Sequence, residues 1–164
     1  MLVATAISLC ACADPSNHVQ SEDLTTEIAI KDVPTSVITL VNATRPDFTI
    51  SDVLKKERDS RVYYDVEGQL SDGSEIEFDI LMSASGPEIV EIQRDIAWTS
   101  VPDAARALVD GANEKGDRIS RVIESTQTDG AIIYEVFIDG SSAPKFEVWS
   151  KESNYKLLSE RWEH

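Results

Sequence analysis

The sequence predicts an α+β fold built from two tandem repeats, each a helix packed on an antiparallel meander of about four strands. Two observations indicate it. The dipeptide Val33-Pro34 recurs as Val101-Pro102, and each proline opens a run with helical spacing of apolar residues. After each run come short segments of β-branched and aromatic residues with polar alternation, separated by turn-forming residues. Such a recurring order is typical of two copies of one supersecondary unit.

The two predicted helices begin at these prolines. Proline suits the first helical turn, because its missing N–H has no partner there in any case. Pro46 ends the first helix, and Gly111 ends the second. The apolar residues expected on the core side are Val37, Ile38, Leu40 and Val41 in the first copy, and Ala104, Ala105, Leu108 and Val109 in the second.

Corresponding strands follow each helix. Residues 62–66 match residues 132–136, and residues 76–80 match residues 145–148. The other strands are predicted at residues 50–54, 88–94, 119–123 and 155–162, and a short one at residues 27–30. The first repeat then covers residues 33–98 and the second covers residues 99–164. Units of roughly 65 residues are marginal on their own, so we expect the copies to pack together, for instance as one continuous sheet.

The first twelve residues read as a targeting segment. They are apolar and uncharged, too short to span a bilayer as a helix, and of the length of a secretory apolar region. Their end, Leu9-Cys10-Ala11-Cys12, resembles a bacterial lipobox, which assigns the lipidated residue to Cys12; a simple cleaved signal is the alternative. No basic residue precedes the apolar run, so we expect the true start to lie upstream. Residues 13–32 are polar and acidic, as in a tether, and the protein is expected to be exported, as a periplasmic or outer-membrane-associated lipoprotein anchored to the membrane.

The charge and the reactive residues exclude several functions. Thirty acidic residues face fifteen basic ones, a formal net charge of −15, which argues against nucleic-acid binding. From Ala13 onward there is no cysteine, and the two histidines are His18, in the tether, and His164, at the end of the chain. We therefore expect no enzyme, no cofactor and no metal site.

The acidic residues offer weaker possibilities. Glu75, Glu77 and Asp79 alternate on one predicted strand and are interpreted as the solvated face of an edge strand, with paired-carboxylate catalysis as the alternative. Residues 72–75 and 139–141 could hold calcium weakly, but hairpin turns explain both segments.

Four aromatic residues form the candidate binding surface, because tryptophan and tyrosine are common at interface hot spots. The alternative is that they fill the core and the junction between the repeats. They are Tyr63, Trp98, Trp149 and Trp162.

The whole pattern resembles the PepSY-like family of small exported bacterial domains, whose architecture is related to that of β-lactamase-inhibitory proteins. The resemblance lies in the Val-Pro helix starts, the segment Pro46-Asp47-Phe48-Thr49-Ile50, and the strands Tyr64-Asp65-Val66 and Tyr134-Glu135-Val136. It implies a binding or inhibitory module without catalytic residues. We therefore expect an extracytoplasmic binding module that takes a protein or peptide partner on its sheet face. The alternatives are an inhibitor or regulator of an exported hydrolase, and a structural or weakly cation-binding envelope protein.

Overall fold

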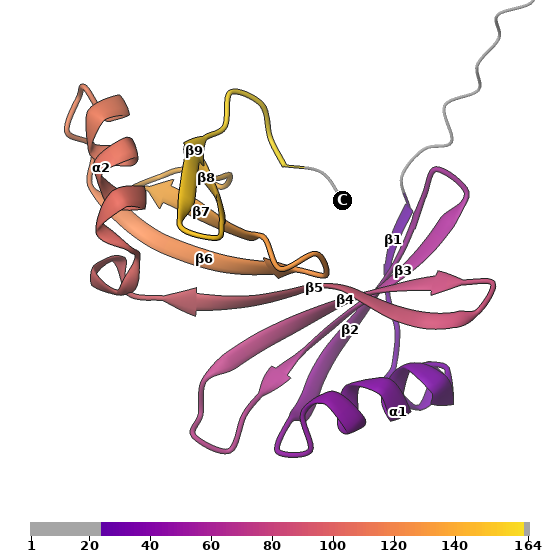
Figure 1. Cartoon of the computed structure of the whole chain (residues 1–164). Helices are drawn as coiled ribbons and strands as arrows, with labels where there is room; N and C mark the ends of the chain where they lie inside the picture. The colour runs from indigo at the N-terminus through magenta and orange to yellow at the C-terminus, as the bar shows by residue number, and fades with distance from the viewer. Residues whose placement is uncertain (1–23, 163–164) are drawn as a thin grey trace, which may run out of the picture.

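A computed structural model describes residues 24–162. The predicted signal segment, Cys12, His18, His164 and most of the tether lie outside these residues. The described chain contains nine strands, two α-helices and two short 3-10 helices (Figure 1). The elements are β1 (Leu24–Glu27), η1 (Ile30–Asp32), α1 (Thr35–Thr44), β2 (Thr49–Arg58), β3 (Arg61–Gln69), β4 (Glu75–Ser83), β5 (Gly86–Ile96), η2 (Trp98–Ser100), α2 (Asp103–Ala112), β6 (Ile119–Gln127), β7 (Ile132–Ile138), β8 (Phe146–Lys151) and β9 (Asn154–Leu157). Neither described α-helix has the length and apolar character needed to cross a membrane.

All nine strands belong to one antiparallel sheet, in which each strand pairs with its neighbours in the chain. The predicted fold of two repeats, each a helix on its own four-stranded meander, is therefore wrong. β5 pairs directly with β6, from Glu91 opposite Gln127 to Ile96 opposite Val122, so no sheet boundary separates the halves. An additional strand, β1, pairs with β2 at the edge. Two strands joined by a short turn can be recognised in the sequence as a pairing hairpin. β5 and β6 are separated in the sequence by η2 and α2, so no such turn indicates that they pair.

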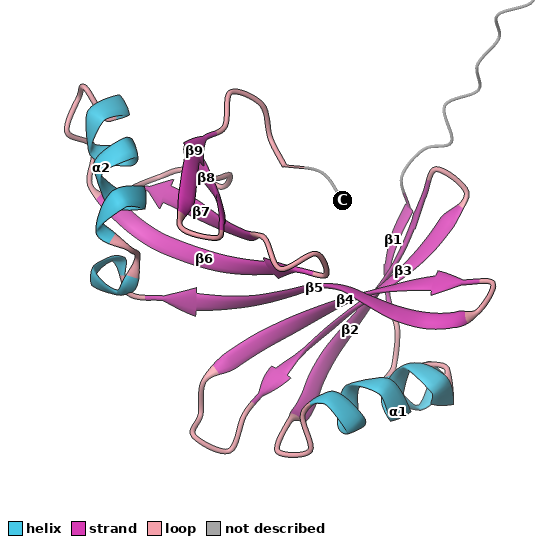
Figure 2. Cartoon of the chain, viewed as in Figure 1, coloured by secondary structure: helices cyan, strands magenta, loops and turns pink. Residues whose placement is uncertain are grey.

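The two helices lie against different parts of the same sheet face (Figure 2). Helix α1 buries Val37 and Val41 against a core that contains Val66 and Phe78. Helix α2 buries Ala105 and Val109 against a second core, which contains Val122, Tyr134, Val136 and Val148. Register places both cores on one side. Phe78 of the first core lies opposite Ile92, and Ile96, four residues further along the same face of β5, lies opposite Val122 of the second core.

The opposite side of the sheet carries neither helix, and we call it the helix-free face. Asp65, Asp79 and Glu91 point to it, since they alternate with the core residues Val66, Phe78 and Ile92. The interpretation of Glu75, Glu77 and Asp79 as the solvated face of an edge strand is wrong as to the edge, because β4 is an interior strand, and wrong for Asp79, which is only 3% exposed; Glu77 is half-buried and Glu75 is exposed. The helix-free face is thus partly buried, although it is built largely from polar residues.

Candidate binding face

Acidic side chains lie directly opposite one another across three neighbouring strands. Asp65 on β3 is opposite Asp79 on β4, and Asp79 is opposite Glu91 on β5. In the next row Glu67 is opposite Glu77. Like charges in directly opposed positions destabilise a sheet, and burial increases the effect. A conflict of this kind at the centre of a sheet marks the helix-free face as a candidate functional site.

Polar neighbours offset only part of this charge. Lys56 on β2 forms an ion pair with Asp65, which is 2% exposed. Gln127 and Gln93 donate hydrogen bonds to the two carboxylate oxygens of Glu91, the latter at 2.9 Å, and Gln127 also donates to Ser125 Oγ. The polar row therefore runs across five strands, β2 to β6, with one lysine at its end.

The protonation of the acidic groups reflects this environment. Burial, followed by the nearby charge of Asp79, raises the pKa of Asp65 to about 7, although Lys56 acts in the opposite direction. Burial and the charges of Asp79, Asp65 and Glu67 raise the pKa of Glu77 to about 8. Desolvation is the largest single influence on the pKa of Lys56 and lowers it, but the hydrogen bond to Asp65 and the charges of Asp65, Asp79 and Glu77 together outweigh it, so the net shift is upward. At neutral pH the cluster therefore holds protons that isolated carboxyl groups would have lost.

A second acidic pair continues the face into β7 and β8. Glu135 lies opposite Glu147. Burial and the charges of Glu91 and Glu147 raise the pKa of Glu135 to about 7, while Arg161 and Arg121 lower it. The interaction of Glu135 with Glu91 links this pair to the row on β3 to β5.

An open groove of about 270 Å³ lies over the acidic end of the face. Its two arginines are already engaged within the chain: Arg121 pairs with Asp95 at 2.9 Å, and Arg94 pairs with Glu124 at 2.6 Å. Among the described residues, the acidic groove residues without a basic partner are Asp52, Glu67, Glu75 and Glu77. The groove is therefore electrostatically complementary to a cationic group.

The predicted aromatic surface is only partly assembled. Tyr63 and Trp162 line one cavity of about 260 Å³ together with Leu81 and Val90. Trp149 lies opposite Ile133 on the helix-free face, outside that cavity. Trp98 lies in η2 and packs against the α2 core, so it is not part of this surface.

Three carboxylates could together hold a cation. Ligand atoms of Asp65, Glu77 and Asp79 lie within 4.8 Å of one another, and oxygen donors of this kind suit calcium. The turn sites proposed for calcium engage their acids otherwise: Asp72 accepts hydrogen bonds from Ser74 N and Oγ, and Asp139 pairs with Arg118. The sequence pattern does not identify six residues of this face: Lys56, Asp65, Glu67, Glu91, Glu135 and Glu147. The alternation of polar and apolar residues shows which residues of one strand share a face, but which residues of neighbouring strands meet depends on the register.

Comparison with known proteins finds no match for this chain, whether with family models, with curated proteins or with solved structures. The PepSY-like resemblance therefore rests only on the sequence pattern described above.

Proposed function

We propose that the protein is a non-enzymatic binding module, and that the helix-free face of its sheet binds a basic segment of a protein or peptide partner. Export and anchoring through Cys12 remain part of this proposal; they would place the binding face outside the cytoplasm. The observation that supports the proposal best is the set of opposed acidic residues along β3 to β5, above all Glu67 opposite Glu77, neither of which forms an ion pair with a basic residue of the described chain.

A lysine or arginine side chain in the groove would lie beside Glu77, whose pKa is raised by burial and by the charges of neighbouring acids, so binding would favour the ionised form of Glu77 and add ion pairs. The groove is open to solvent and lined by strand residues, which suits an extended peptide. The net charge of −15 would also accelerate encounter with a basic partner.

Replacing the opposed glutamates is expected to weaken binding of a basic peptide. The probe is a fluorescein-labelled peptide of alternating lysine and serine, and the readout is fluorescence anisotropy at low and physiological salt. The double variant Glu67→Gln, Glu77→Gln should bind at least about tenfold more weakly than the unaltered chain, which corresponds to about 1.4 kcal/mol. Binding by the unaltered chain should weaken as salt rises.

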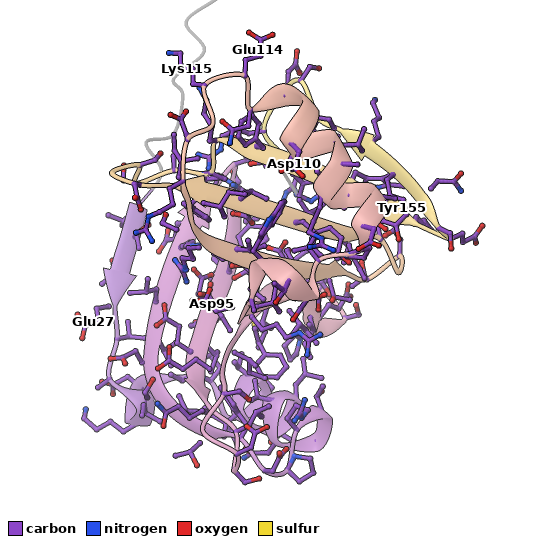
Figure 3. The ribbon with its side chains drawn as sticks, turned by 90° about the vertical axis from the view of Figure 1, so that its left-hand side faces the viewer. Glu27, Asp95, Asp110, Glu114, Lys115 and Tyr155 are labelled. Atoms are coloured by element: carbon purple, nitrogen blue, oxygen red, sulfur yellow. The ribbon has the colours of Figure 1, made fainter. Side chains whose placement is uncertain are left out.

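A matched control removes two charges elsewhere. Asp110→Asn with Glu114→Gln changes the formal net charge equally, but these residues lie on α2 and the turn after it, away from Asp95 at the groove (Figure 3). This control should change the affinity by less than about twofold. An equal loss in both double variants would mean that only net charge attracts the peptide, and the proposed site would then be wrong.

A further inference from the structure

The last residues that the structure describes cross the helix-free face. After β9, residues 158–162 leave the sheet and turn back toward the middle of the molecule (Figure 1). Leu158 N donates to Glu147 O at 2.9 Å, and Trp162 N donates to Glu147 Oε2 at 2.6 Å. Arg161 Nε lies 3.4 Å from the other oxygen of the same carboxylate. One buried acid, 8% exposed, therefore holds a basic residue and the backbone of the residue after it.

The side chain of Trp162 reaches the other half of the sheet. It lines the 260 Å³ cavity with Tyr63 on β3 and Leu81 on β4, far from Glu147 in the chain. Trp162 nevertheless remains 38% exposed, and the side chain of Arg161 is 62% exposed. The segment is thus attached at a few points and is not part of either core.

We infer that Arg161 and Trp162 are an internal occupant of a second part of the helix-free face, at Glu147 and the cavity beside Tyr63, and that the partner presents there a basic residue followed by an aromatic one in an extended segment that replaces them. This inference rests on the proposed function and specifies its partner. The chemistry of the contact supports it, because Glu135 and Glu147 lie opposite each other, Arg161 forms an ion pair with Glu147, and the charge of Arg161 also lowers the pKa of Glu135. The cavity beside Tyr63 and Leu81 is apolar on one side and suits an aromatic ring.

An internal occupant lowers the apparent affinity for an external one. The tethered segment competes at a high effective concentration, so the partner binds only the fraction of molecules in which the segment has left. Weakening the contacts of Arg161 and Trp162 should therefore strengthen binding of a peptide of the same chemistry. A segment that served only to support the fold would have no such effect.

The test uses the full chain carrying Arg161→Gln and Trp162→Gly. The probe is a fluorescein-labelled peptide Ser-Arg-Trp-Ser, with Ser-Gln-Trp-Ser as its uncharged counterpart. We expect the double variant to bind the arginine peptide at least about tenfold more tightly than the unaltered chain, and the glutamine peptide with little gain. Adding Glu147→Gln should remove the gain, and the control Arg118→Gln, which removes one exposed arginine beside Asp139, should leave the affinity unchanged.

An unchanged or weaker affinity of the double variant would overturn the inference. Circular dichroism establishes that each variant is folded; should the double variant unfold, Trp162→Ala alone must still show a gain. The result is separable from the proposed function. Loss of lysine-peptide binding in the Glu67→Gln, Glu77→Gln variant without a gain here would refute only this inference. A gain here, with lysine-peptide binding unaffected by Glu67 and Glu77, would refute only the placement of the partner in the acidic groove.

Discussion

Raising the pH from 5 to 8 is expected to lower the free energy of unfolding by a few kcal/mol. In the folded protein the pKa of Asp65 is about 7, that of Glu77 about 8 and that of Glu135 about 7, all well above the ordinary values of 3.8 and 4.5. Between about pH 4 and pH 8 the folded state therefore holds more protons than the unfolded state, and stability falls as the pH rises. One pKa unit corresponds to about 1.4 kcal/mol, but the groups interact and Glu77 is partly exposed, so their contributions do not add in full.

Urea denaturation at pH 5, 6.5 and 8 measures this dependence. Glu77→Gln should stabilise the protein at pH 8, by on the order of 1 kcal/mol, and should flatten the pH dependence, because it removes one of the repelling charges. Glu75→Gln is the matched control, two residues earlier on the same face of β4 and exposed. Greater stability at pH 8 than at pH 5 in the unaltered chain would show that the acidic row is not protonated in the folded state.

The expected effects of Glu77 on stability and on binding have opposite signs. In the double variant with Glu67→Gln, the same substitution should weaken peptide binding while it strengthens the fold. Residues that serve only the fold do not behave in this way, whereas binding residues often reduce stability. Measured together, the two effects separate a binding face from a merely unfavourable arrangement of charges.

Gly68→Ala is expected to destabilise the protein by about 3 kcal/mol. A Cβ at this position would lie 2.1 Å from the backbone oxygen of Thr49 and 2.6 Å from Cζ of Phe48. The ring of Phe48 packs edge-on against Phe78, at 5.1 Å between centroids, so it cannot move without disturbing the α1 core. The backbone oxygen belongs to β2, which would have to shift relative to β3.

Chemical denaturation of this variant has a matched control in Gly111→Ala. Gly111 lies in α2, where an added Cβ meets nothing within 4 Å. That substitution should stabilise the helix by about 0.5–1 kcal/mol, since alanine is the better helix former. If Gly68→Ala were as stable as the unaltered chain, the close packing of Phe48 over β3 would be contradicted.

Local structure follows closely from the residues. Helix α1 lies between Pro34 and Pro46, and α2 follows Pro102, where the spacing of apolar residues predicts them. The strand predicted at residues 62–66 lies within β3, and that at residues 132–136 lies within β7. The ends of the chain were less predictable: the last strand, β9, ends at Leu157, and the predicted strand at residues 27–30 is replaced by β1 at Leu24–Glu27.

The candidate site was only partly predictable. Residue type identifies Tyr63 and Trp162, and alternation along one strand identifies Glu77 and Asp79, but that alternation predicts a solvated face, whereas Asp79 is buried. Nothing in a single strand shows that Asp65 will lie opposite Asp79 and Asp79 opposite Glu91. That depends on the register of β3 to β5, and the register shifts between Asp79 and Ile80.

The residues alone account for the helices, for most strands and for the acidic surplus, because these depend on spacing and composition over a few neighbouring positions. The tertiary structure decides that the strands form one sheet, that the acids meet in rows on its helix-free face, and that Arg161 and Trp162 return to that face. The reason is physical: contacts between residues distant in the chain depend on strand register and on the path of the tail, and both are set by the packing of the whole sheet.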